Sequence, residues 1–148
     1  MDERKDKYAA LKLENQLCFP LYACSKEIIR RYRPYLDELD LTYTQYIAMM
    51  VFWEEKQCSV KALGKKLFLD SGTLTPVLKS LEQKGYVKRQ RSAADERLLI
   101  VAITEKGENL KERAIAVPQK IAGCIQLEPQ ESVALYQLLH KVLGNMEE

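Results

Sequence analysis

The chain has 148 residues, of which 47% are hydrophobic and 30% charged, a composition that indicates one globular domain and excludes a disordered chain. No apolar run approaches the ~18 residues that span a membrane, and no hydrophobic stretch follows the charged residues 1–7, so we expect a cytoplasmic protein without a membrane anchor. The net charge is only +2, but residues 59–91 carry +6 and the rest of the chain −4. This asymmetry is compatible with a polyanionic partner for the middle of the chain or with a solvated basic face.

The first predicted element is a long amphipathic helix over residues 11–39. Its apolar residues recur at helical steps and include Leu13, Leu17, Leu21, Ile28 and Tyr32, a pattern typical of a helix with one wide apolar face. Two prolines interrupt it. Pro20 suits a first turn or a kink, and we expect Pro34 to end or bend the helix.

Three shorter helices are predicted next. The sequence Thr42-Tyr43-Thr44-Gln45 forms a capping box for an apolar, central helix over residues 46–55. Ser59 then caps a helix over residues 60–69. A turn at residues 70–73 opens the third helix, over residues 74–84, with Thr73 or a neighbour as N-cap so that Pro76 lies in the first turn. Gly85 closes that helix.

The pattern then changes to that of strands. Residues 86–91 and 97–103 flank the polar loop 92–96, which predicts a β-hairpin with a charged tip. Thr104 caps a helix that continues to about residue 118. An irregular connection containing Cys124 leads to Glu128 and Pro129, the cap and first-turn proline of a last helix.

A helix-turn-helix followed by a hairpin predicts a winged helix-turn-helix, so the fold class is mainly α with a small β-hairpin wing. A helix with small polar residues at its N-terminal end can enter the major groove of DNA, while wing residues reach phosphates and the minor groove. The alternative is a winged helix that binds protein rather than DNA. The candidate DNA-binding residues are Ser71, Thr73, Thr75, Pro76, Lys79, Arg89, Arg91, Asp95 and Arg97.

The sequence resembles a known family in these same segments. Residues 69–76, Leu78-Lys79, Leu81-Glu82 and the wing's Asp95-Glu96-Arg97 resemble the MarR family of winged-helix repressors. The stretch Leu13-Glu14-Asn15-Gln16-Leu17-Cys18-Phe19, with Tyr22, Tyr32 and residues 41–46, is similar to the OhrR branch, whose members sense organic hydroperoxides. This resemblance covers nearly the whole chain.

The resemblance implies a single MarR-type domain over residues 1–148. The winged helix-turn-helix would occupy residues 42–104, with N- and C-terminal dimerisation helices in residues 8–39 and 105–148. A homodimer of this kind binds double-stranded DNA at a palindromic operator, with one winged domain on each of two successive major grooves.

Cys18 is the candidate redox-sensing residue, because a thiolate attacks peroxides and the start of a helix favours an anion, a condition that Cys18 meets if its helix begins close to Asn15. Tyr22 lies four residues on and shares its helix face. Tyr32 lies about 21 Å along an unbroken helix and cannot reach Cys18 of its own chain. The resemblance implies that Tyr22, Tyr32 and Tyr43 contact the thiolate, the last two across the dimer; plain core or interface packing is the alternative.

The sequence predicts different roles for the other cysteines. Cysteines 18, 24, 58 and 124 form no CxxC pair and His140 is the only histidine, so we expect neither a metal site nor a cofactor. Cys24 lies about 9 Å along the helix from Cys18, too far for a disulfide. Cys58 is expected to be structural. Cys124 resembles the late resolving cysteine of two-cysteine OhrR proteins, with burial or chance as the alternative.

Three functions are compatible with these features. The first is a DNA-binding repressor that releases its operator when an organic hydroperoxide oxidises Cys18. The second is a MarR-type repressor released by a small phenolic or aromatic-acid ligand without cysteine chemistry. The third, a thiol peroxidase, leaves the basic winged segment unexplained and lacks an acid–base group beside Cys18 in sequence, so we expect a regulator and not an enzyme.

Overall fold

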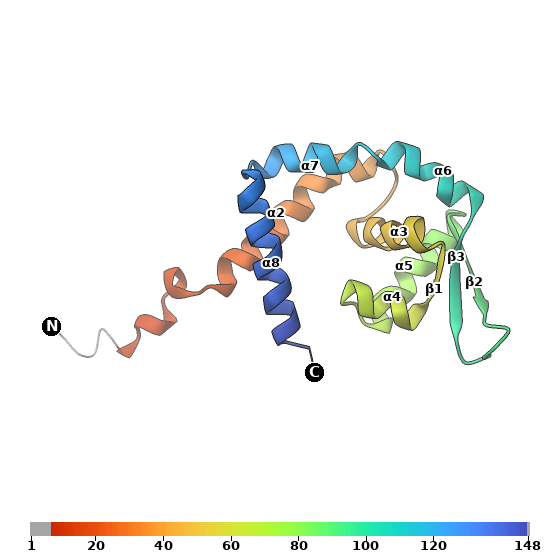
Figure 1. Ribbon diagram of the computed structural model, residues 1–148, viewed down its shortest axis with the longest axis horizontal. Coiled ribbons are helices and arrows are strands. Elements are labelled where there is room, and N and C mark those ends of the chain that lie inside the picture. Colours follow the sequence, from red (N-terminus) through yellow and green to blue (C-terminus); the bar gives the residue numbers. More distant parts are fainter. Residues whose placement is uncertain (1–6, 148) are drawn as a thin grey trace. The chain divides into compact units, whose positions relative to one another are not determined.

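The computed structural model describes residues 7–147, and the chain divides after Val117 into two compact units. Two short 3-10 turns, η1 (Ala9–Leu11) and η2 (Leu13–Asn15), open the first unit. Its helices are α2 (Cys18–Asp37), α3 (Tyr43–Glu55), α4 (Val60–Leu67), α5 (Ser71–Gln83) and α6 (Glu105–Ala114). Its strands are β1 (Gln57–Ser59), β2 (Val87–Arg91) and β3 (Leu99–Ile103), as Figure 1 shows.

The strands form one antiparallel sheet in the order β1-β3-β2. Val101 in the middle of β3 pairs with Cys58 of β1 on one side and with Arg89 of β2 on the other. The predicted hairpin is therefore confirmed, and β1 is an additional strand that the sequence did not predict. Together with the helices, this three-stranded sheet makes a winged helix-turn-helix, the predicted fold class.

The core of the first unit is built around α3, as its apolar sequence predicted. Met49 and Phe52 of α3 are fully buried together with Leu63 of α4 and Leu81 of α5. The Trp53 indole donates a hydrogen bond to the Gly107 carbonyl at the start of α6, with an N–O distance of 2.9 Å. This contact ties α3 to the helix that follows the wing.

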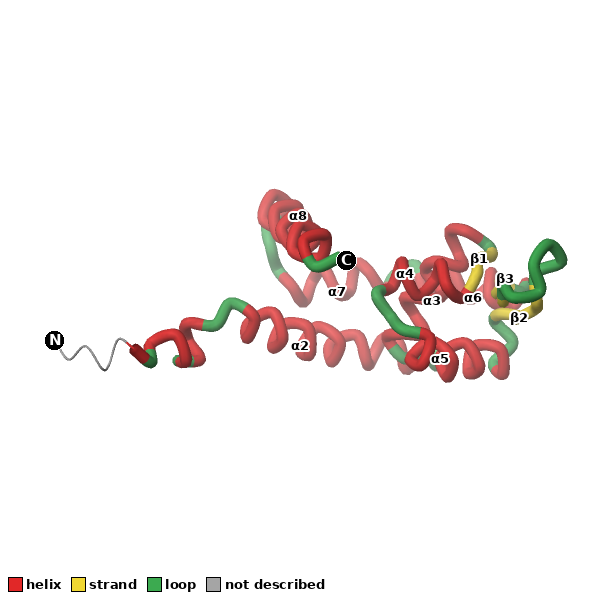
Figure 2. The backbone as a smooth tube through the Cα atoms, turned by 90° about the horizontal axis from the view of Figure 1, so that it is seen from below, coloured by secondary structure: helices red, strands yellow, loops and turns green. Residues whose placement is uncertain are grey.

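Several predicted boundaries are corrected by the structure. α2 begins at Cys18 rather than near residue 11, and it continues three residues past Pro34, so this proline does not end it. Figure 2 shows α2 as one uninterrupted helix. α5 begins at Ser71 with Asp70 as N-cap, which places Pro76 inside the helix and not in its first turn.

The C-terminal segment also differs from the prediction. α6 ends at Ala114, and Pro118 lies in the first turn of a separate helix, α7 (Val117–Ile125). Cys124 therefore lies in a helix and not in an irregular connection. The second unit ends with α8 (Pro129–Asn145), whose predicted start at Glu128 and Pro129 is confirmed by a capping box between Glu128 and Glu131. Between residues 7 and 147, no helix combines the length and apolar character needed to cross a membrane.

Candidate nucleic-acid interface and cysteine site

Helix α5 has the two faces that a DNA-reading helix requires. Asp70 caps it by accepting a 2.7 Å hydrogen bond from the Thr73 backbone N–H, and this bond lowers the pKa of the Asp70 carboxyl. Leu74 and Leu78 are buried against the core. The opposite side is solvent-exposed and carries the predicted base-reading residues Ser71, Thr73, Thr75, Pro76 and Lys79.

One of these candidates is already engaged within the helix. The Thr75 hydroxyl donates a 2.7 Å hydrogen bond to the Ser71 carbonyl. Its oxygen can still accept a bond, but its proton is committed to the backbone. Thr75 is therefore suited to accept from a base amino group or to present its methyl to thymine.

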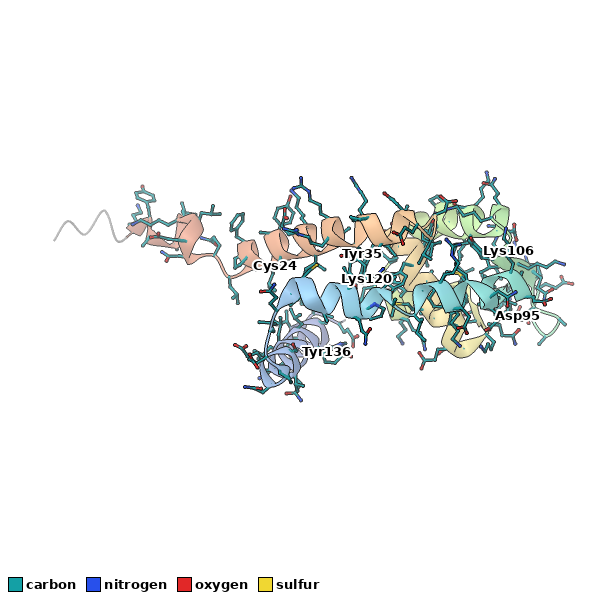
Figure 3. All side chains as sticks on the ribbon, turned by 90° about the horizontal axis from the view of Figure 1, so that it is seen from above. Cys24, Tyr35, Asp95, Lys106, Lys120 and Tyr136 are labelled. Carbon is teal, nitrogen blue, oxygen red and sulfur yellow. The ribbon has the colours of Figure 1, made fainter. Side chains whose placement is uncertain are left out.

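The wing is held by two ion pairs. The Arg89 guanidinium lies 3.2 Å from Glu82 of α5, and the Arg89 backbone N–H donates to the same carboxylate at 2.8 Å. Both contacts lower the pKa of the Glu82 carboxyl, and the hydrogen bond from the Arg89 backbone has a larger effect than the one from the guanidinium. At the tip, Arg97 donates to Asp95 from both its backbone and its side chain, at 3.0 and 3.2 Å, and its side chain is 91% exposed. Figure 3 labels Asp95 in this loop.

Pairing divides the basic residues of segment 59–91 into two groups. Lys66, Lys84 and Arg89 pair with the carboxylates of Glu55, Asp40 and Glu82. The other five basic residues of this segment are exposed, and they are Lys61, Lys65, Lys79, Lys88 and Arg91. Exposed cations of this kind supply the salt-dependent part of DNA affinity.

Cys18 occupies the first position of α2. Its thiol is free and exposed, and the first turn contains no acidic side chain. The backbone N–H groups of a first turn lack helical partners and carry partial positive charge, so they stabilise an anion at this point. Tyr22, one turn on, is 60% exposed and lies under the Lys26 ammonium, 5.1 Å from the ring centroid.

The structure brings Tyr32 and Tyr43 together, with ring centroids 5.0 Å apart. Tyr46 completes the cluster, 5.7 Å from Tyr32 and 6.4 Å from Tyr43. Sequence reasoning did not select Tyr46, although its position three residues after Tyr43 on the same helix was a usable signal. We call these three residues the tyrosine cluster.

Burial raises the pKa values of the tyrosine cluster above their ordinary value of 10, at which a phenol is already protonated at neutral pH. It raises the pKa of Tyr32 to about 12, with Tyr43 and Tyr46 contributing, and it also raises the pKa of Tyr43 and of Tyr46. The phenols therefore remain protonated at neutral pH and can donate hydrogen bonds to an anion.

The predicted sulfur site is not assembled within one chain. Cys18 and Tyr22 lie at the start of α2, and Tyr32 lies fourteen residues after Cys18 in the same helix, which is about 21 Å along the axis. The sequence-based expectation that Tyr32 cannot reach Cys18 of its own chain therefore agrees with the continuous helix.

The remaining cysteines differ in environment. Cys24 is exposed on α2, where Figure 3 labels it, and Cys124 is exposed on α7. Cys58 is half-buried in β1, and burial followed by the nearby Glu55 carboxylate raises the pKa of its thiol, against a smaller opposing effect of Lys66. A raised pKa disfavours the reactive thiolate at Cys58.

Comparison with known proteins identifies relatives over nearly the whole chain. The family described as "Transcriptional regulator SarA/Rot" matches residues 26–114. The organic hydroperoxide resistance transcriptional regulator of Bacillus subtilis is 44% identical over 142 residues, which are 96% of this chain and 97% of that protein. The regulator SarZ of Staphylococcus saprophyticus is 47% identical over 132 residues, 89% of this chain and 90% of that protein.

Among solved structures, reduced AbfR bound to DNA is 38% identical and aligns with a TM-score of 0.76 over 93% of this chain and 98% of that one; AbfR is a protein of Staphylococcus epidermidis. These relatives are regulators of transcription rather than enzymes, in agreement with the expectation from the basic winged segment. The chain belongs to the SarA/Rot family of transcriptional regulators, which have the MarR-type winged-helix fold.

Proposed function

We propose that this regulator is a repressor that binds a palindromic operator as a homodimer and releases it when an organic hydroperoxide oxidises Cys18. One observation carries the proposal. Cys18 is an exposed free thiol at the first residue of α2, where a hydroperoxide in solution can reach the sulfur.

The reaction is a two-electron oxidation of sulfur. The Cys18 thiolate attacks the terminal oxygen of the hydroperoxide, an S–O bond forms and the O–O bond breaks. The products are the sulfenic acid of Cys18 and an alkoxide, which takes a proton from water to become the alcohol. Cys124 is the candidate resolving cysteine: its thiol would condense with the sulfenic acid to give a disulfide and water.

The exposed apolar side chains of the terminal helices support a dimer. Leu17 at the start of α2 is 78% exposed, and Ile29 farther along the same helix is also exposed. α8 exposes Val133, Leu138 and Val142. Apolar surface of this extent is typically covered by a partner, and a second copy of the chain matches the two-fold symmetry of a palindrome.

In such a dimer the tyrosine cluster of one subunit would face the sulfur of the other. Its protonated phenols would donate hydrogen bonds to the Cys18 thiolate, and the sulfenic acid would disturb them. A 100-fold loss of operator affinity requires a difference of about 2.8 kcal/mol between the two states, which is within the range of two or three lost hydrogen bonds.

The names of the relatives agree with this proposal at two levels. The B. subtilis relative is named for organic hydroperoxide resistance, and AbfR has been solved in reduced, disulfide and overoxidised forms. SarZ is named only as a transcriptional regulator, so regulation of transcription is common to the named relatives, whereas hydroperoxide sensing is the finer proposal for this chain.

The test is operator binding by gel shift, with and without an organic hydroperoxide. Cys18→Ser should bind the operator and ignore the peroxide, whereas the matched control Cys24→Ser, on the same helix, should be released like the wild type. Release of Cys18→Ser by peroxide would place the sensor elsewhere. Release of the wild type by a phenolic acid, with no response to peroxide, would instead support the alternative of a ligand-controlled repressor.

The role of Cys124 is tested separately on non-reducing gels. If Cys124 resolves Cys18 across the dimer, oxidised protein should run as a crosslinked dimer and Cys124→Ser should abolish the crosslink. If oxidised protein forms only mixed disulfides with added small thiols, Cys124 is not the resolving cysteine.

A further inference from the structure

Gln45 is a buried polar side chain, only 7% exposed, in the first turn of α3. Its carbonyl oxygen accepts hydrogen bonds from the Thr42 backbone N–H and from the Lys84 ammonium, both at 3.1 Å. Its amide nitrogen donates to the Ser80 hydroxyl at 3.0 Å. A single side chain therefore closes the capping box of α3 and contacts α5 at two points.

The contacts on the α5 side lie at the C-terminal end of the helix, where Ser80 directly follows the candidate DNA-binding residue Lys79. Ser80 lies in the last turn of α5, and Lys84 is its C-cap. The Lys84 ammonium also donates to the Asp40 backbone carbonyl and lies 3.6 Å from the Asp40 carboxylate. The connection between α2 and α3 is thus fastened to the same end of α5.

On the other side, Gln45 lies between two members of the tyrosine cluster. Tyr43 and Tyr46 flank it in sequence, and both rings pack on Tyr32 of α2. Because Gln45 closes the cap of this turn, a displacement of Tyr43 and Tyr46 displaces the Gln45 amide as well. Ser80 belongs to the same thirteen-residue helix as Thr73 and Lys79, so a rigid-body shift of α5 at Ser80 would move both candidate DNA-binding residues.

We propose that the Gln45 amide couples the tyrosine cluster to the DNA-reading helix α5 through Ser80 and Lys84, so that Gln45 is a positioning residue for operator binding. The trigger, oxidation at Cys18, rests on the proposed function; the coupling itself does not. Burial makes the coupling effective, because a buried amide that loses a partner cannot replace it with bulk water.

The first test separates oxidation from release. Ser80→Ala removes the acceptor of the Gln45 amide N–H and leaves the two contacts of the Gln45 carbonyl oxygen, with Thr42 and Lys84, in place. We expect Cys18 to be oxidised at the wild-type rate, but the ratio of reduced to oxidised operator affinity to fall from about 100-fold to below 10-fold. Ser80→Thr retains a hydroxyl and should restore the ratio.

The matched control is Thr44→Ala, which removes a hydroxyl from the same turn of α3. The Thr44 hydroxyl lies 3.3 Å from that of Thr42, so the change is local to the cap, and we expect a wild-type release ratio. A wild-type ratio in Ser80→Ala as well would overturn the coupling. Thermal melting of each variant verifies that it is folded.

The second test needs no peroxide. A double-mutant cycle combines Tyr32→Leu, which removes the ring but keeps an apolar side chain, with Ser80→Ala and measures operator affinity of the reduced protein. We expect the combined effect to differ at least threefold from the product of the single effects, which exceeds the scatter of independent sites.

If the changes in binding free energy of the two single variants simply add in the double variant, the coupling is refuted, whatever the response to peroxide. The proposed trigger fails if peroxide does not release the wild-type protein from the operator, or if it does release Cys18→Ser. In either case the double-mutant cycle still tests the coupling. The two failures are therefore distinguishable.

Discussion

The Glu82 carboxylate on α5 accepts the backbone N–H of Arg89 on β2 at 2.8 Å and lies 3.2 Å from its guanidinium. Helix α5, the candidate DNA-reading helix, and the wing are therefore joined by a charge-assisted contact. The sequence predicted that Arg89 contacts DNA, and the ion pair of Arg89 with Glu82 indicates that it orients the wing.

This pair makes a prediction about acid stability. The pKa of Glu82 is held below its ordinary value of 4.5, so the stabilisation is fully present above that value and is lost as the pH falls below it. Glu82→Gln should therefore lower the free energy of unfolding at neutral pH, and the difference from wild type should shrink in acid. Urea unfolding at both pH values measures it, with the exposed wing residue change Glu96→Gln as control; an equal difference at both pH values would argue against the ion pair.

From the exposed basic side chains of α5 and the wing we expect operator binding to weaken as the salt concentration rises. If Arg91 contacts a phosphate, Arg91→Ala should weaken binding to all sequences and reduce the slope of log affinity against log salt by about 1. Arg97→Ala should do the same and should also loosen the wing tip, because the Asp95 carboxylate loses its ion pair and keeps only the backbone N–H of residue 97. Fluorescence anisotropy over a salt series checks this, with Lys111→Ala on α6 as control. Unchanged slopes in both wing variants would remove the wing from the interface.

Base discrimination is expected from the exposed side of α5. Loss of a direct base contact, as in Lys79→Ala or Thr73→Ala, should cost about 1–3 kcal/mol on the cognate operator and relax the preference at one base position. Affinity for a panel of single-base operator variants measures the effect. A footprint should cover two half-sites about 10 bp apart, and protection of one half-site alone would contradict the dimer.

Gly107 provides a prediction about folding. A Cβ at this position would lie 2.3 Å from the Tyr86 carbonyl oxygen and 2.8 Å from an Ile103 side-chain carbon. Backbone cannot give way cheaply, so Gly107→Ala should destabilise the protein by about 1–3 kcal/mol or more. Gly123→Ala is the control, because beyond its own helix no atom of the described residues would lie within 4 Å of a Cβ at this position, and it should be neutral or slightly stabilising. Equal unfolding midpoints for the two variants would refute the packing argument.

Local signals predicted local structure well. The capping box of Thr42 and Gln45, the Ser59 cap and the start of α8 depend on residues within one helical turn, and all three were correct. The start of α2 was wrong because side chains intervene: Asn15 and Gln16 donate to the carbonyls of Ala9 and Ala10, and such bonds compete with a continuous helix.

Features that depend on distant residues were not predicted. β1 is three residues long and exists through its pairing with β3, more than forty residues later. The contact between Gln45 and Ser80 joins residues 35 positions apart, and no spacing rule predicts it. Tyr32 and Tyr43 were predicted individually as site residues, but their packing with Tyr46 became evident only from the folded chain.

The central claim is that oxidation of Cys18 itself releases the operator. The most direct measurement adds an organic hydroperoxide in sub-stoichiometric steps to the wild-type protein on labelled operator. It then compares the fraction of DNA released with the fraction of Cys18 that is oxidised, either labelled by a sulfenic-acid reagent or found in a disulfide. The account predicts that the two fractions rise together, with Cys24 and Cys58 unlabelled until release is complete. Full release while Cys18 remains unlabelled and reduced would contradict it.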